Sequence, residues 1–76
     1  MLKNMNKKSL KQHLDSAGIN NDKYSLNGGL PNEKYCLGEN EEYWETYYSE
    51  RGTKTSLNKF KREDEACNYF YDWITK

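Results

Sequence analysis

The side chains best suited to catalysis in this 76-residue chain are one histidine and two cysteines. His13, Cys36 and Cys67 are far apart in the sequence and form no CxxC pair or other metal-ligand spacing. A nucleophile needs a general base within hydrogen-bond reach and a third group that orients the base. The sequence indicates no such set around these residues or around the Glu50-Arg51 pair. We therefore predict that the protein is not an enzyme and holds no metal or cofactor.

The two cysteines and the polar N-terminal segment predict a protein of a reducing compartment. Free Cys is among the residue types most often buried, so we expect Cys36 and Cys67 to be reduced and to pack as small apolar side chains. The alternative, a structural disulfide, needs an oxidising compartment. Residues 1–8 contain no apolar run typical of a signal peptide or a membrane span. We expect a cytoplasmic protein that binds no membrane, with residues 1–8 flexible.

Two other short motifs could suggest ligand sites, and both have simpler structural explanations. The consecutive carboxylates of residues 63–65 fall in the first turn of an expected helix, where the helix dipole favours negative charge. Adjacent helical positions diverge by about 100° each, so these groups cannot all converge on one metal ion. Asn27-Gly28-Gly29 lacks the longer glycine pattern of a phosphate-binding loop and precedes the turn residues Pro31-Asn32. We predict that residues 63–65 begin a helix and that residues 27–29 and 31–32 form turns.

Composition and charge predict one small folded domain spanning residues 1–76. Only 34% of the residues are hydrophobic, but 14% are aromatic, and large rings can build a core in a short chain. The 12 basic and 12 acidic side chains cancel, yet residues 39–50 hold five Glu and no Lys or Arg. This acidic window disfavours nucleic acid as a partner and would suit a basic protein surface, unless it is only a solvated hairpin.

Periodicity and turn residues predict a helix near each end of the chain and several short strands between them. The elements are expected at residues 9–17, 24–26, 35–37, 43–48, 56–60 and 63–74. Ser9 and Gln12 have the spacing of a capping box, and Gly18 would end the first helix, with Ile19 closing back on Leu14. These pieces predict an α+β fold, in which an N-terminal and a C-terminal helix cover one face of a small antiparallel sheet of three to four strands.

The expected strand at residues 43–48 has two distinguishable faces. Alternation places Trp44, Thr46 and Tyr48 on one face, which we predict to be the core side because the other face carries a charge. The other face should be open to solvent and form a protein-binding surface, since aromatic anchors supply contact area and carboxylates steer a basic partner. Its predicted contact residues are Glu41, Glu42, Tyr43, Glu45 and Tyr47, with Arg51 at the rim.

Most of the chain after Ile19 resembles one protein family. The residues that carry the resemblance are Tyr24-Ser25-Leu26-Asn27-Gly28-Gly29-Leu30-Pro31-Asn32-Glu33, Tyr35-Cys36-Leu37, Trp44-Glu45, Tyr47-Tyr48-Ser49-Glu50-Arg51-Gly52, Phe60, Glu63, Glu65-Ala66-Cys67 and Tyr69-Phe70. This pattern is similar to the small immunity proteins of bacterial polymorphic toxin systems. Thr46 departs from it where an apolar β-branched residue is expected, and Arg62 departs from it where Ser or Thr would complete a capping box with Glu65.

The resemblance implies a protein that binds a cognate toxin domain in the cytosol of the producing cell and blocks it, without acting on a substrate. On this hypothesis the partner is the toxin protein, no nucleic acid is bound, and the chain is a monomer. The alternative is a small nucleic-acid-binding or regulatory module of unknown target, in which the Lys-rich first helix would be the contact element.

Overall fold

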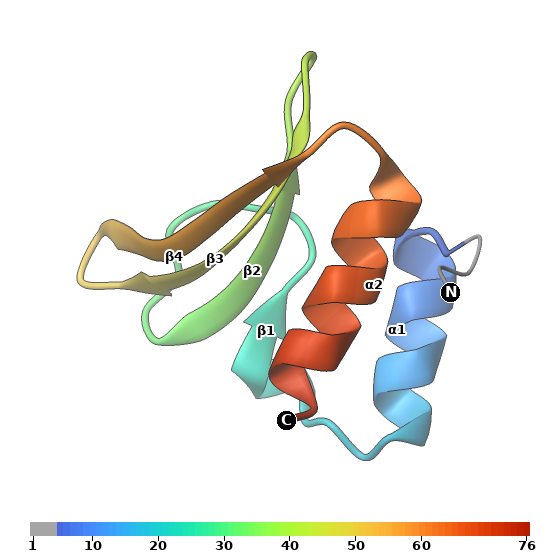
Figure 1. Ribbon diagram of the computed structural model, residues 1–76. Helices are drawn as coiled ribbons and strands as arrows, with labels where there is room; N and C mark the ends of the chain where they lie inside the picture. Colours follow the sequence, from blue (N-terminus) through green and yellow to red (C-terminus); the bar gives the residue numbers. More distant parts are fainter. Residues whose placement is uncertain (1–4) are drawn as a thin grey trace.

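The computed structural model describes residues 5–76, which form one sheet and two α-helices. In chain order the elements are α1 (Lys7–Ser16), the short 3₁₀ helix η1 (Asn21–Lys23), β1 (Tyr24–Ser25), β2 (Lys34–Glu39), β3 (Trp44–Glu50), β4 (Thr53–Phe60) and α2 (Glu63–Ile74). The two α-helices lie side by side, and α2 packs directly on β2, β3 and β4 (Figure 1). The predicted α+β fold, with a helix near each end of the chain, is confirmed.

The sheet is mixed, with strand order β1-β2-β3-β4. β2, β3 and β4 are antiparallel neighbours, as the sequence predicts. β1 pairs in parallel with β2, with Tyr24 opposite Tyr35. The direction follows from the connection, because residues 26–33 cross the sheet before β2 begins and so return the chain to the end at which β1 started.

The N-cap of α1 lies three residues before the predicted N-cap, Ser9. Asn6 is the N-cap, and its Oδ1 accepts the Ser9 N–H at 2.9 Å while Ser9 Oγ accepts the Asn6 N–H at 2.9 Å. Ser9 therefore completes a capping box from the third helical position and is not the cap itself, because Asn6 is at least as good an N-cap residue. Residues 1–4 of the segment expected to be flexible lie outside the described residues, whereas Met5 is buried and Lys7 begins the helix.

The C-terminus of α1 confirms the predicted glycine ending. Gly18 has φ of 77°, in the left-handed region that glycine adopts without strain. The Ile19 N–H donates to the Leu14 carbonyl at 3.0 Å, and the Gly18 N–H donates to the Asp15 carbonyl at 3.1 Å. These two bonds define a Schellman motif, which satisfies carbonyls that the end of a helix would otherwise leave unpaired.

The core lies between the two helices and one face of the sheet. Its fully buried side chains are Leu10 and Leu14 of α1, Leu37 of β2, and Ala66, Cys67 and Phe70 of α2. Trp44 is half-buried against this cluster, and the Tyr48 ring lies 5.2 Å from that of Tyr35, which itself contacts Trp73. The predicted assignment of the Trp44 face of β3 to the core is therefore confirmed.

Thr46, the polar residue on that core face, is fully buried. Its hydroxyl makes no hydrogen bond with any group of residues 5–76. A buried hydroxyl without a partner costs free energy, whereas an apolar group of the same shape does not. We predict that Thr46→Val raises the free energy of unfolding by about 1 kcal/mol, measured by urea denaturation.

A matched control for this prediction is Thr55→Val, because the Thr55 hydroxyl donates to the Tyr48 carbonyl at 3.1 Å. Thr55→Val removes an existing hydrogen bond, whereas Thr46→Val removes none, so the control should not stabilise the protein. Stabilisation by both substitutions, or by neither, would show that the missing partner of Thr46 is not the cause.

The two cysteines are free and buried. Cys67 belongs to the core, while Cys36 pairs in register with Tyr47 on the sheet face that points away from the helices. Burial raises the pKa of Cys67 to about 12 and also raises that of Cys36, which keeps both thiols protonated at neutral pH.

We predict that dithiothreitol leaves the melting temperature unchanged and that iodoacetamide alkylates neither cysteine at neutral pH until urea unfolds the chain. Thermal melts with and without reductant, and mass spectrometry of the alkylated protein, provide the test. A reductant-dependent fall in melting temperature would instead indicate a disulfide.

Candidate functional site

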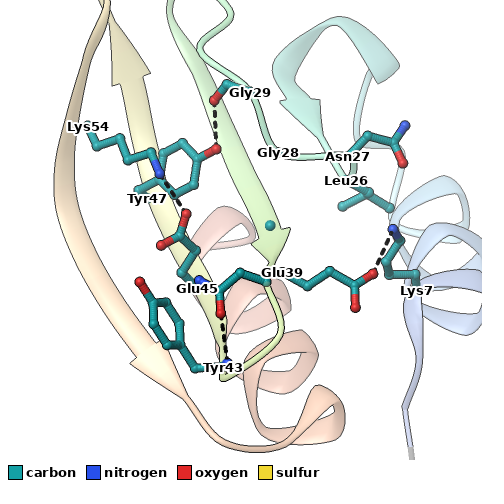
Figure 2. A pocket seen from close by; sticks show the side chains of 12 residues that line it. Lys7, Leu26, Asn27, Gly28, Gly29, Glu39, Tyr43, Glu45, Tyr47 and Lys54 are labelled. Carbon is teal, nitrogen blue, oxygen red and sulfur yellow. Dashed lines mark hydrogen bonds and ion pairs between the residues drawn. The ribbon is translucent and has the colours of Figure 1, made fainter.

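A loop covers the sheet face that points away from the helices, which we call the outer face. This crossing loop, residues 26–33, connects β1 to β2. The Gly28 N–H donates to the Leu37 carbonyl at 3.0 Å, and the Tyr47 hydroxyl donates to the Gly29 carbonyl at 2.6 Å (Figure 2). The loop is therefore fixed to both β2 and β3.

The crossing depends on two glycines. A Cβ atom added to Gly38 of β2 would lie 3.4 Å from the Gly28 Cα atom, so the two backbones approach without side chains between them. Gly28 also has φ of 67°, which disfavours any side chain there. The sequence predicts a turn at Gly28, whereas the structure places this residue within the crossing loop, and nothing in the sequence indicates that the loop packs on Gly38.

A groove with a volume of about 450 Å³ opens beside this crossing on the outer face. We call it the outer groove; its lining residues are Lys7, Leu26, Asn27, Gly28, Gly29, Gly38, Glu39, Asn40, Tyr43, Glu45, Tyr47 and Lys54 (Figure 2). They come from the start of α1, the crossing loop, the end of β2, the β2–β3 turn and the paired strands β3 and β4. The groove thus gathers parts of the chain that are distant in sequence.

Charged and aromatic groups alternate along the β3 side of the outer groove. Lys54 Nζ lies 2.7 Å from Glu45 Oε2 and 4.5 Å from the centre of the Tyr47 ring. Lys59 Nζ lies 4.7 Å from the centre of the Tyr43 ring. Each ammonium group therefore has an aromatic face beneath it, and Glu45 already has a cationic partner.

Tyr47 is not the exposed contact residue that the sequence predicts. Only 1% of its surface is exposed, and burial raises the pKa of its hydroxyl to about 12. Glu45 is 9% exposed and is paired with Lys54. The prediction of an open outer face is wrong at these two positions, because alternation along a strand does not reveal that a distant loop returns over the same face.

The remaining predicted contact residues lie at opposite ends of β3. Glu41 and Glu42 are exposed in the turn before β3, and Tyr43 is half-buried beside them. Arg51 is exposed in the turn after β3. The structure therefore brings the two glutamates and Tyr43 together in one turn, of which Tyr43 lines the outer groove, and places Arg51 away from them.

The turn that carries the two glutamates is held by Asn40. Its Oδ1 accepts the Glu42 N–H at 2.8 Å and the Tyr43 N–H at 3.0 Å, and its own N–H donates to the Tyr43 carbonyl at 3.0 Å. This acidic turn, residues 40–43, projects beyond the rest of the sheet (Figure 1). The Asn40 side chain therefore fixes the backbone of the turn from which the two carboxylates extend into solvent.

A second groove, with a volume of about 550 Å³, lies on the other side of Lys7. We call it the lysine groove; its lining residues are Lys7, Lys8, Lys11, Asn21, Tyr24, Ser25, Leu26, Asn27, Pro31 and Lys34. The sequence indicates a Lys-rich first helix but not that Lys34, which begins β2, joins it. The two grooves share Lys7, Leu26 and Asn27.

A third surface is an aromatic ridge where α2 meets β3 and β4. Its residues are Tyr35, Tyr48, Phe60, Tyr69 and Trp73. Their rings form a continuous row of contacts, from Tyr48 through Tyr35, Trp73 and Tyr69 to Phe60. Tyr69 is 39% exposed and the others are half-buried. The ridge is an alternative protein-binding surface, because partly exposed Tyr and Trp are common at interface hot spots.

The groups considered for catalysis are not brought together. His13 is exposed on α1 with its ring 6.0 Å from that of Tyr71, while Cys36 and Cys67 are buried on different faces of the sheet. Within residues 5–76, no three His, Cys, Asp or Glu side chains gather in a way that could hold a metal ion. In the same part of the chain, no helix is long and apolar enough to cross a bilayer.

Comparison with known proteins identifies no relative: no family model, no curated protein and no solved structure matches the chain.

The hydrogen bond that fixes the crossing loop can be removed selectively. Tyr47→Phe should lower the free energy of unfolding by about 1 kcal/mol, because the Gly29 carbonyl loses its partner. Amide hydrogen exchange in residues 26–33 should accelerate more than exchange in α2. Tyr43→Phe is the control, since the Tyr43 hydroxyl has no hydrogen-bond partner among residues 5–76. Equal effects of the two substitutions would contradict this account of the loop.

Proposed function

We propose that the protein is an immunity-type inhibitor, which neutralises a cognate bacterial toxin domain by direct contact in the cytosol and acts as a monomer without catalysis of its own. The resemblance over residues 24–70 to immunity proteins of polymorphic toxin systems supports this proposal. The aromatic and charged surfaces of the small domain support a role in binding a protein.

The observation that carries the proposal is the acidic turn beside the outer groove. Glu41 and Glu42 project from the sheet on a backbone that Asn40 holds, and half-buried Tyr43 lies next to them. Carboxylates at the tip of a projecting turn attract a basic partner over a distance, while an adjacent aromatic ring supplies contact area. The groove behind the turn offers room for a partner side chain.

An acidic surface suits the inhibition of a toxin with a basic active site. Enzymes that act on nucleic acids or other phosphates use Lys and Arg to hold the substrate, so an acidic protein surface competes for the same groups. In the proposed complex the acidic turn lies over such a basic site and keeps the anionic substrate out. In this proposal buried Glu45, paired with exposed Lys54, maintains the shape of the surface and does not contact the toxin.

The lysine groove favours a second candidate function, a small nucleic-acid-binding or regulatory module. Its four lysines are the basic cluster that phosphate binding requires. Two of them already have acidic neighbours, since Lys11 Nζ lies 2.8 Å from Asp15 and Lys7 Nζ lies 3.7 Å from Glu39. Binding that weakens steeply as salt increases would support this candidate.

The proposal predicts that a reading frame next to the gene encodes a toxin domain, and this domain provides the test. Expression of that domain should arrest growth, and co-expression of this chain should restore it. Glu42→Lys should lower the association rate for a catalytically inactive toxin domain by about tenfold at low salt and weaken protection, with an unchanged circular-dichroism spectrum. Surface plasmon resonance measures the rate.

Asp72→Lys is the charge-matched control, because Asp72 is exposed on α2 beside Tyr69 and Trp73 of the aromatic ridge. It should bind and protect like the wild type. Loss of binding in the Asp72 variant alone would place the inhibitory surface on the ridge. A wild-type chain that neither binds the toxin domain nor restores growth would overturn the proposed function.

A further inference from the structure

The lysine groove follows the free edge of the sheet. β1 is the first strand in the sheet order, so its outer edge pairs with no other strand of the described chain. Lys8 of α1 and Lys34, at the start of β2, both line the groove. The edge strand itself contributes Tyr24 and Ser25 to the lining.

The charges that line the lysine groove are all positive. Four lysines line it and no Asp or Glu does. Lys7 and Lys11 are partly neutralised by Glu39 and Asp15, which lie outside the lining. Lys8 and Lys34 make no ion pair with any carboxylate in residues 5–76. Two ammonium groups without an ion-pair partner therefore share a groove with the residues of an edge strand.

The rest of the lining is largely apolar or made of neutral polar groups. Leu26 and Pro31 are half-buried, and Tyr24 is buried with its ring against Phe70 at 6.4 Å. An extended peptide can use such a surface in two ways, by pairing its backbone with the strand edge and by placing alternate side chains in the groove. Its acidic side chains would then lie near the lysines.

We propose that the lysine groove binds an extended acidic segment of a protein partner, which lies along the outer edge of β1 and places carboxylates against Lys8 and Lys34. This inference does not rest on the proposed inhibition of a toxin, because it follows from the strand edge and the charges around it. It adds to the acidic turn a second surface of opposite charge.

A peptide fits this groove better than a nucleic acid. Single-stranded nucleic acids are held by aromatic side chains on which bases stack, in addition to positive charge. Tyr24 is the one aromatic side chain of the lining, and it is buried with its hydroxyl bonded to Asn21 at 3.0 Å. The groove therefore offers charge and a strand edge but no stacking surface.

The test uses a fluorescein-labelled peptide of alternating Glu and Thr, titrated with the full chain at low salt and followed by fluorescence anisotropy. The double variant Lys8→Glu with Lys34→Glu should lower the affinity by at least about tenfold, equivalent to about 1.4 kcal/mol. The control is Lys61→Glu with Lys76→Glu, which changes the net charge equally at exposed positions outside the groove. It should bind like the wild type.

A second readout locates the peptide. Backbone amide resonances of residues 24–27 should shift when the Glu-Thr peptide is added, and a Lys-Thr peptide should leave them unchanged. Equal losses of affinity in the two double variants would mean general charge attraction and would overturn the proposal. The proposal would also be overturned if a labelled oligothymidine bound more tightly than the Glu-Thr peptide and lost this binding in the Lys8 and Lys34 double variant. The groove would then be a nucleic-acid site.

Neither peptide outcome depends on the toxin experiment. Failure of the Glu-Thr peptide to bind removes the groove proposal and leaves inhibition through the acidic turn intact. Failure of the chain to protect cells against the toxin leaves the peptide measurement unaffected.

Discussion

The close contact between the backbones of Gly28 and Gly38 determines how the outer face of the sheet is built. Because neither residue has a side chain, the crossing loop can lie directly on β2, where a Cβ at Gly38 would be only 3.4 Å from Gly28 Cα. The Tyr47 hydroxyl then reaches the Gly29 carbonyl. Without this crossing the outer face would be an open strand surface, and neither groove would have its second wall.

The crossing also separates the charges of an electrically neutral protein. Lys7 lines both grooves and pairs with Glu39 at 3.7 Å, so it marks the boundary between them. The acidic turn lies on one side of this boundary and the lysine groove on the other. A net charge of zero therefore conceals two surfaces of opposite sign, which together favour a partner with a complementary arrangement of charges.

The features that the sequence predicts well depend on neighbouring residues. Gly18 and Ile19 form the expected helix ending because the motif is complete within a few positions, and the side of Trp44 follows from strand alternation. The start of α1 is less certain from sequence, since Asn6 and Ser9 are both good caps. Only the full structure shows that Asn6 is the N-cap of α1 and that the Ser9 hydroxyl accepts the hydrogen bond from the Asn6 N–H.

The features that the sequence does not predict depend on distant contacts. Burial of Tyr47 requires Gly29, 18 residues earlier in the chain, and the lysine groove requires Lys34 to approach residues of α1. The parallel pairing of β1 has the same origin, because the connection that crosses the sheet sets its direction. Glu41 and Glu42 are exposed and Tyr43 is half-buried, as expected for residues on an outward face, and their role in binding a partner stays a prediction.

The central claim is that this protein meets its partner through the outer face, at the acidic turn and the crossing loop. Hydrogen–deuterium exchange of the chain, alone and bound to a catalytically inactive form of the proposed toxin domain, tests this claim most directly. We expect slower exchange on binding at residues 26–29 and 40–43, with α2 unchanged. Protection confined to residues 69–73 of α2, with the turn and the loop exchanging as in the free protein, would contradict the claim and assign the interface to the aromatic ridge.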